Sequence, residues 1–373
     1  MDISSELIHS LLPVFMVTTL GASMVTVGII EGIAEATASV MKVFSGAVSD
    51  YLRKRKTLVI LGYGLAAFTK PLFPLATSVN WVFSARFIDR VAKGIRGAPR
   101  DALIADLTPI KLRGAAYGLR QALDSAGALI GPLLAMLLML WLANDIRAVM
   151  WFAVLPAFIA VALLFIYVRE PERPHTDKSA RVRLTFSDAR RLPLYYWLVV
   201  LLGAIFTLAR FSEAFLVLRA QDTGLELGYV PLVMIVMNIF YAAAAYPAGA
   251  AADKISQRSL LLSGLALLIA ADLILAFASS PLTVFLGAAL WGLHMAFTQG
   301  LLSKLVADTA PSDLLGTAFG VFNLVSGGAL LLASIIAGSL WSAAGPAATF
   351  LAGAAFASVA ATGLLFALAG KSK

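Results

Sequence analysis

The 373-residue sequence contains no cysteine and few charged residues. Without cysteine the chain forms no disulfide and has no thiol nucleophile or thiolate metal ligand. Charged residues make up 13% of the chain, whereas soluble globular domains have about 25%. Together with 60% hydrophobic residues, this composition indicates an integral membrane protein.

The sequence also lacks the motifs of several enzyme classes. It has no H-E-x-x-H zinc motif, no G-x-S-x-G nucleophile motif and no G-x-x-x-x-G-K-[ST] phosphate loop, and its histidines, His9, His175 and His294, are scattered. No removable signal peptide and no basic patch with interleaved aromatics is visible. We therefore expect neither an enzyme nor an ATP-driven pump, and we expect no metal, no cofactor and no nucleic-acid partner.

Apolar segments of membrane-spanning length recur along the whole chain. A helix needs about 20 apolar residues to cross the hydrocarbon core, and alternating strand patterns are absent. We predict an all-α membrane protein with twelve spans near 3–22, 25–49, 57–76, 81–105, 114–142, 148–168, 194–219, 227–251, 259–279, 282–306, 315–342 and 347–369.

Lysine and arginine are concentrated on one side of these spans. They follow spans 2, 4, 6 and 8 and end the chain, while the opposite side has only Arg147 and Arg219. The positive-inside rule then places both termini in the cytoplasm and explains the net charge of +8. We expect the membrane to be a bacterial cytoplasmic membrane. The polar, proline-containing segment 169–193 is interpreted as a cytoplasmic linker between six-helix bundles at 1–168 and 194–373.

The two halves repeat each other. GAVSD from Gly46 recurs as GAAAD from Gly249, 203 residues later, and ADLTPIKLRGAAYG from Ala105 recurs as ADTAPSDLLGTAFG from Ala307, at an offset of 202. We infer a duplicated six-helix unit, an architecture in which the substrate site lies between the halves. At the 203 offset Met1 aligns with Ala204, so the first span should be short at its N-terminus or the start methionine internal.

The segment GAVSDYLRKRK resembles the signature loop of the major facilitator superfamily, which has a glycine, three residues, an aspartate and then a basic cluster. The resemblance implies a loop that latches the two halves on the cytoplasmic side. The residues of this loop and of its second copy are Gly46, Asp50, Arg53, Arg55, Gly249, Asp253 and Arg258.

In span 5, the residues Gly127, Gly131 and Pro132 resemble the G-x-x-x-G-P motif of antiporter members. That resemblance places the chain with an antiporter-like bacterial branch and implies export. On physical grounds the same residues form a small packing face with a kink.

The segment Trp81–Asp106 carries seven charged residues, although apolar spans flank it. On a helix they lie within an arc of about 140°. Charged side chains at membrane depth face a water-filled cavity or paired partners, so this stripe predicts an aqueous path. Its basic excess favours an anionic solute. In span 2, Glu31, Glu35 and Lys42 share one face, and the basic stripe of span 4 is their natural partner.

Two hypotheses explain these charges: a proton relay beside an anion-attracting cavity, or a static lattice of salt bridges. The proton-coupling candidates are Glu31, Glu35, Asp89, Glu6 and Asp124. The substrate-binding candidates are Arg86, Arg90, Lys93, Lys42, Arg120, Arg210, Glu213, Asn238, His294 and Asn323. Arg96, Arg100 and Asp101 are nearer the cytoplasmic mouth and are candidate gate residues, and Arg210 and Glu213 are expected to pair with each other or with the first half.

We therefore expect a monomeric secondary transporter that works by alternating access, with a small-molecule substrate, protons and membrane lipids as its partners. The favoured activity is proton-coupled efflux of an anionic or zwitterionic compound or drug. The alternatives are proton-coupled uptake of an organic anion, and a transporter-like sensor that does not transport.

Overall fold

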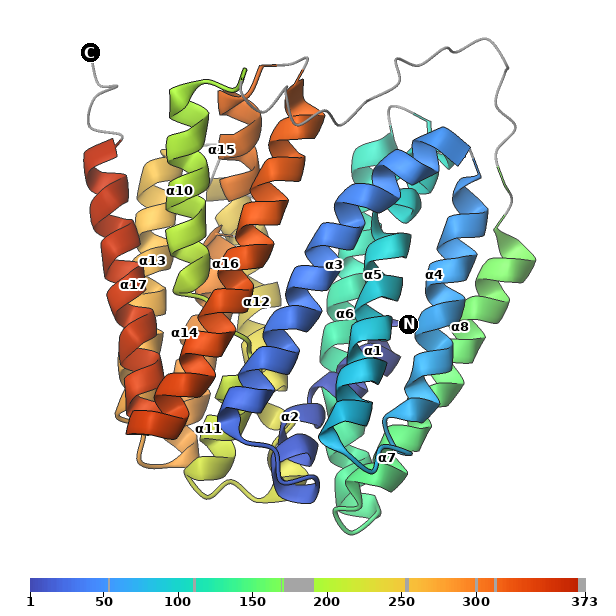
Figure 1. Ribbon diagram of the computed structural model, residues 1–373, viewed down its shortest axis with the longest axis vertical. Coiled ribbons are helices and arrows are strands. Elements are labelled where there is room, and N and C mark those ends of the chain that lie inside the picture. Colours follow the sequence, from blue (N-terminus) through green and yellow to red (C-terminus); the bar gives the residue numbers. More distant parts are fainter. Residues whose placement is uncertain are drawn as a thin grey trace.

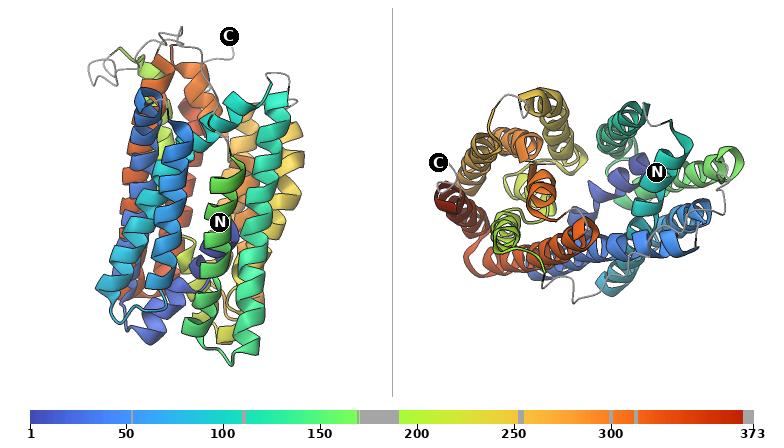
Figure 2. Two further views of the ribbon diagram at one scale, coloured as in Figure 1. Left: turned by 90° about the vertical axis from the view of Figure 1, so that its right-hand side faces the viewer. Right: turned by 90° about the horizontal axis from the view of Figure 1, so that it is seen from above.

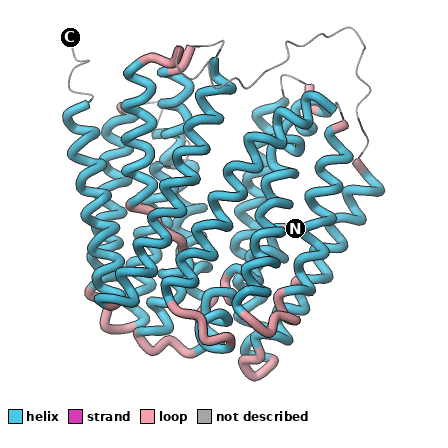
Figure 3. The backbone as a smooth tube through the Cα atoms, viewed as in Figure 1, coloured by secondary structure: helices cyan, strands magenta, loops and turns pink. Residues whose placement is uncertain are grey.

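The computed structural model describes residues 1–52, 54–109, 112–168, 170, 191–251, 255–298, 301–311 and 314–367. These residues form helices joined by short turns, and no strand occurs among them (Figure 3). Of the predicted linker 169–193, only 170 and 191–193 are among the described residues.

The first six predicted spans correspond to one group of helices. Their elements are α1 (Asp2–His9), α2 (Leu12–Val14), the π-helical turn η1 (Phe15–Thr19), α3 (Met24–Leu52), α4 (Arg55–Thr69), the 3-10 turn η2 (Lys70–Leu72), α5 (Val79–Leu107), α6 (Arg113–Trp141), α7 (Ile146–Phe152) and α8 (Val154–Tyr167).

The last six predicted spans correspond to a second group. Their elements are α10 (Leu194–Leu208), α11 (Ala214–Asp222), the 3-10 turn η4 (Leu227–Tyr229), α12 (Leu232–Ala251), α13 (Gln257–Ala276), α14 (Pro281–Thr298), α15 (Leu301–Thr309), α16 (Leu315–Ala344) and α17 (Pro346–Ala367). The two groups stand side by side in Figures 1 and 2. The predicted all-helical fold of twelve spans in two related bundles is confirmed.

Eight of the spans are long and apolar enough to cross a membrane by themselves. The others are spans 1, 3, 4 and 7, and each departs from a plain apolar helix for a visible reason. Span 1 is interrupted at Pro13, which has no N–H to donate. Span 3 continues from α4 into the turn η2, span 4 carries the charged stripe, and span 7 is broken between α10 and α11.

The internal repeat is visible in how corresponding helices pack. Gly62 of α4 lies against Arg96 of α5, and Gly264 of α13 lies against Thr298 of α14. Both residues of the second contact are 202 positions after those of the first. Gly21 and Gly224, at the 203 offset, both have a positive φ angle, 67° and 90°. The two halves therefore share local geometry as well as sequence.

The two groups of helices meet closely at the end of the molecule opposite the C-terminus and diverge toward the end that carries it (Figure 1). At the closed end α3 and α16 are so close that neither Gly28 nor Gly338 has room for a Cβ atom. Gly228 of η4 packs there against Asn144 and Leu140 of α6 and its following turn. The N-terminus lies at mid-height of the first group, where Asp2 faces Gly127 of α6.

Candidate substrate cavity and its charge network

A cavity of about 490 Å³ lies between the two groups of helices. The first group lines it mainly with charged side chains, which are Glu6, His9, Glu35, Arg90 and Lys93. The second group contributes Arg210, Glu213 and Asn238 within a largely apolar wall that includes Phe206, Phe211, Met234, Met237, Met295 and Phe322. This volume is typical of a site for a small organic molecule, roughly 300–1,000 Å³.

Two ion pairs connect α3 to α5 like successive rungs of a ladder. Arg86 Nη2 lies 2.7 Å from Glu31 Oε2, and Arg90 Nη1 lies 3.1 Å from Glu35 Oε1. Glu31 and Glu35 are about one helical turn apart on α3, and Arg86 and Arg90 are about one helical turn apart on α5, so the packing of these two helices forms both pairs. Glu31 is fully buried, whereas Glu35 reaches the cavity. The expected pairing of span 2 carboxylates with the basic stripe of span 4 is confirmed.

His9 of α1 joins this ladder to the cavity. Its Nε2 lies 3.7 Å from Glu31 Oε2 and its Nδ1 lies 3.5 Å from Glu6 Oε2. One imidazole therefore bridges a cavity-facing carboxylate and a buried one. In the sequence alone, His9 is one of three scattered histidines. The signal that could have identified it is its spacing of three residues from Glu6 on one helix.

Lys70 is a second residue that the predicted network omits. Its Nζ lies 2.8 Å from Asp89 Oδ1 and donates to Ser5 Oγ at 3.1 Å, and its side chain is almost completely buried. Thr69 donates to the same Asp89 oxygen at 3.3 Å. A single lysine in an otherwise apolar span was the available signal, because such a charge needs a partner. The Asp89 carboxylate is thus bound by two side chains of span 3.

A third group of charges connects α5 to α6 toward the end where the halves diverge. Arg120 Nη1 lies 2.9 Å from Asp101 Oδ1, and Asp124 lies 3.6 Å from Arg100 and 3.7 Å from Arg120. Arg96 instead places its guanidinium over the Tyr63 ring, 4.5 Å from the ring centre. The candidates Asp124 and Arg120 therefore lie together, away from the Glu31–Arg86 and Glu35–Arg90 pairs.

Three charged side chains that line the cavity have no ion pair or hydrogen bond with any residue that the structure describes. They are Lys93, Arg210 and Glu213. Arg210 and Glu213 lie in the break between α10 and α11, and the expected pairing between them, or between them and the first half, does not form. Irregular backbone at membrane depth occurs where it lines a cavity. Ser212, between them, accepts a hydrogen bond from Ala214 N–H at 3.3 Å.

The remaining predicted substrate contacts are placed differently. Asn238 lines the cavity and donates across the halves to the Ala128 carbonyl at 3.2 Å. His294 is fully buried within the second group, with Nδ1 2.8 Å from the Gly264 carbonyl oxygen. Lys42 is exposed near Gly97, and Asn323 is half-buried beside Phe322. His294, Lys42 and Asn323 are not among the lining residues.

The predicted motif of span 5 packs against span 1. A Cβ atom on Gly127 would lie 2.9 Å from that of Asp2, and one on Gly131 would lie 2.8 Å from that of Glu6. Pro132 lies within α6. These glycines therefore let α1, which carries Glu6 and His9, approach α6 closely.

The predicted latch is described in part. Arg55 lies 2.7 Å from Asp106, and Glu170 accepts hydrogen bonds from the backbone N–H groups of Arg55 and Lys56, both at 2.8 Å. Gly46 meets α5 only at ordinary contact distance, and the tightest approach of α3 and α5 is at Gly94.

In the second copy of the latch, a Cβ atom on Gly249 would meet nothing within 4 Å. Arg258 donates to the Leu365 carbonyl at 2.5 Å. Arg53, Asp253 and the Asp50 side chain lie outside the described residues.

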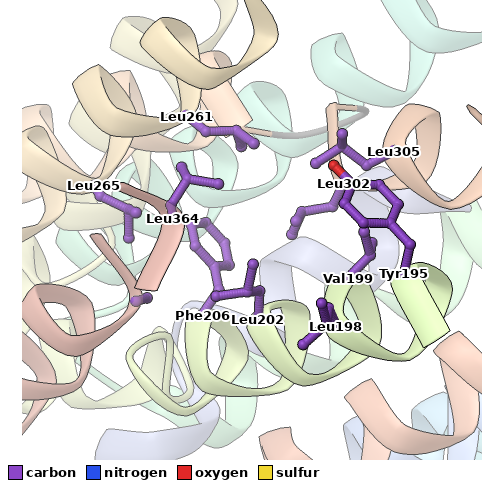
Figure 4. Close-up of a pocket in the computed structure, with 11 residues that line it drawn as sticks. Tyr195, Leu198, Val199, Leu202, Phe206, Leu261, Leu265, Leu302, Leu305 and Leu364 are labelled. Carbon is purple, nitrogen blue, oxygen red and sulfur yellow. The ribbon is translucent and has the colours of Figure 1, made fainter. Parts of the chain in front are cut away.

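A second, much smaller cavity of about 30 Å³ lies inside the second group (Figure 4). Its lining is apolar and comes from α10, α13, α15 and α17, including Leu198, Leu265, Leu305 and Leu364. It is too small for an organic solute, so the cavity between the halves is the candidate substrate site.

Comparisons with known proteins agree with this geometry. The model of the Major Facilitator Superfamily matches residues 1–219 and again 214–372. An uncharacterised MFS-type transporter of Methanocaldococcus jannaschii is 34% identical over 98% of this chain and 91% of its own length. The class H tetracycline resistance protein of Pasteurella multocida is 26% identical over 75% of this chain and 71% of its own length.

Among solved structures, a bacterial homologue of the human lysosomal transporter Spinster, in an inward-facing and unoccupied conformation, has the same fold. It superposes with a TM-score of 0.77 at 16% identity and covers 98% of this chain and 93% of its own. The two matches to the family model, the M. jannaschii relative and the paired bundles all lead to one conclusion: the chain belongs to the Major Facilitator Superfamily of membrane transporters.

Proposed function

We propose that this protein is a secondary transporter that exports a small amphipathic organic anion or zwitterion in exchange for protons. The observation that carries the proposal is the set of unpaired charges, Lys93, Arg210 and Glu213, in a cavity between the two halves. Water or a charged solute must satisfy charged groups at this depth, because no described protein group does so.

The way in which the halves meet supports alternating access. The halves touch through α3 and α16 at one end and diverge at the end that carries the C-terminus (Figure 1). The positive-inside rule assigns the diverging end to the cytoplasm. On this assignment both termini are cytoplasmic and the conformation is open to the cytoplasm.

The lining of the cavity sets the chemistry of the solute. Lys93 and Arg210 offer two cations to a carboxylate, sulfonate or phosphate, and Glu213 offers a carboxylate to an amine. In the same cavity, Phe206 and the thioethers of Met234 and Met237 offer apolar surface to the rest of the solute. Methionine adapts its shape to different apolar surfaces, so solutes with one charge pattern and different apolar parts can share the site.

Proton coupling would use the path from Glu6 through His9 to Glu31. The cavity reaches Glu6 and His9, while Glu31 lies behind them with Arg86 as its counter-ion. A proton that moves from the cavity to Glu31 weakens the Glu31–Arg86 pair and so changes how α3 packs on α5. Because α3 also packs against α16 at the closed end of the molecule, a change in the packing of α3 would alter how readily that end opens.

The direction of export rests on the similarity to the tetracycline resistance protein and on the span 5 motif. Uptake remains the competing direction, because the cavity lining is compatible with movement either way.

A binding screen tests the proposed site. Purified protein is mixed with panels of amphipathic anions, zwitterions and cations of matched size, and ligand-induced thermal shifts are recorded. Anions or zwitterions should stabilise the protein. In Arg210→Gln the dissociation constant of the best ligand should rise about 10- to 150-fold, the equivalent of a charged hydrogen bond of about 1.5–3 kcal/mol.

The matched control is Arg113→Gln, an exposed arginine that donates to the Ala105 carbonyl and does not line the cavity. This variant should bind as the unmodified protein does. Stabilisation by cations alone, or equal affinity in both variants, would refute the proposed site.

A further inference from the structure

Asp272 of α13 is a fully buried carboxylate outside the cavity. Its relative exposure is 0%, and neither of its oxygens has a hydrogen-bond partner among the described residues. A Cβ atom on Gly353 of α17 would lie 2.6 Å from Asp272 Oδ2 and 3.0 Å from the Phe211 ring. Asp272 and Phe211 therefore pack against the same glycine, and Phe211 also lines the cavity.

No cation among the residues that the structure describes neutralises this carboxylate. Helix α13 packs against α14 and α17. The described part of α17 has no ionisable side chain, and α14 offers only His294, whose Nδ1 is engaged by the Gly264 carbonyl. Arg210 and Glu213 of the span 7 break face the cavity.

Arg219 of α11 is the other cation near this end of α13. It binds the carbonyls of Leu275, Ala276 and Ala278 and forms an ion pair with Asp222. Its guanidinium is therefore occupied, and Asp272 has no counter-ion among the described residues.

The internal repeat shows what occupies the same place in the first half. At the 202 offset, which also relates the Gly62 contact to the Gly264 contact, Asp272 corresponds to Lys70 and Trp291 to Asp89. Lys70 and Asp89 form a buried ion pair at 2.8 Å. In the second half the cation is replaced by a carboxyl group and the anion by an indole, and Trp291 Nε1 also has no hydrogen-bond partner in the described part of the chain.

Burial of an ionised carboxylate without a counter-ion is very costly, and such a group takes up a proton instead. We propose that Asp272 is a proton-binding site: it is held as a neutral carboxylic acid behind Phe211. When Phe211 moves, the proton on the Asp272 carboxyl exchanges with water in the cavity. Proton binding rests on the packing of the second half alone, and only the exchange step rests on the proposed transport function.

Infrared spectroscopy of the purified protein at neutral pH tests the site without any transport. A carboxylic-acid C=O band should be present in the unmodified protein and absent from Asp272→Asn, which keeps the size and neutrality of the group. Asp145→Asn is the matched control, because Asp145 is an exposed helix N-cap and asparagine caps equally well. This control should keep the band.

A second variant covers the case in which Asp272→Asn does not fold. Gly353→Ala keeps the carboxyl group but adds a methyl group whose carbon would lie 2.6 Å from Asp272 Oδ2, so the carboxyl group must move and the same band should shift. Transfer to D2O should shift the band faster in Phe211→Ala than in the unmodified protein.

An identical band in the unmodified protein and Asp272→Asn would overturn the proposal, as would a band that Gly353→Ala leaves unchanged. Stabilisation by Na⁺ that disappears in Asp272→Asn would identify a metal-cation site and would also overturn it. Equal D2O exchange in Phe211→Ala would refute the route past Phe211.

Discussion

The buried pair Glu31–Arg86 yields a quantitative prediction that separates it from the cavity-facing pair Glu35–Arg90. Arg86→Met leaves Glu31, which is fully buried, with only His9 at 3.7 Å. Removal of one partner of a buried ion pair costs about 3–5 kcal/mol, because the other charge stays buried without compensation. Glu31→Leu, which leaves Arg86 buried without its carboxylate, should cost a similar amount.

The double variant Glu31→Leu with Arg86→Met buries no charge, so its unfolding free energy should lie close to that of the unmodified protein. The two single losses then do not add, and the coupling energy is several kcal/mol. Unfolding in detergent micelles, followed by tryptophan fluorescence, measures all four proteins.

The matched control is the same cycle at Glu35 and Arg90. The Glu35 side chain is 30% exposed in the cavity, where water can solvate it. This pair should therefore couple by about 1 kcal/mol or less. Additive losses at Glu31 and Arg86, or equal coupling in the two cycles, would refute the reasoning that burial sets the strength of each pair.

Three further predictions concern transport. His9→Gln should abolish the dependence of flux on a proton gradient but preserve exchange of the solute across vesicles, because it removes the bridge between Glu6 and Glu31 and leaves Arg210 in place; unchanged gradient-driven flux would contradict the bridge. Gly338→Ala should weaken closure at the α3–α16 interface, where there is no space for a Cβ atom, whereas Gly64→Ala, with nothing within 4 Å, should have no effect. Because the chain has no cysteine, a single Thr207→Cys places the only thiol in the cavity, and an impermeant maleimide added on the closed side labels it only when that side opens. Equal labelling in the Gly338→Ala and Gly64→Ala variants would refute the predicted weakening of closure. Lys93→Gln should lower the affinity for anionic solutes and leave cationic ones unaffected, as competition binding would show; an equal loss for both would contradict a direct contact.

The fold could be predicted because few backbone structures can span a membrane. Backbone groups in lipid must be paired internally, so long apolar segments become helices, and the sequence repeat identified the second bundle from the first. The break in span 7 could not be predicted, because the residues between Leu208 and Ala214 include neither proline nor glycine. Their unwinding depends on the cavity that the folded halves create.

The candidate site was predictable where residues share one helix face. Glu31 and Glu35 indicated partners on span 4, and Arg86 and Arg90 supply them. Contacts between helices far apart in the sequence were not visible. The distance from His9 to Glu31 depends on where α1 lies relative to α3, and the distance from Lys70 to Asp89 depends on how η2 packs on α5. Asp272 is visible in the sequence as an acidic residue within span 9, but its lack of a partner among the described residues is a property of the packed bundle.

The central claim is proton-coupled movement of a solute through the cavity between the halves. The most direct measurement uses proteoliposomes that contain only this protein, a radiolabelled ligand from the binding screen and an internal pH-sensitive dye. An imposed proton gradient should drive the ligand against its own gradient while protons move the opposite way, and Arg210→Gln should abolish both fluxes. Protons that move in the same direction as the ligand would contradict antiport, and the absence of gradient-driven ligand flux in the unmodified protein would contradict the account as a whole.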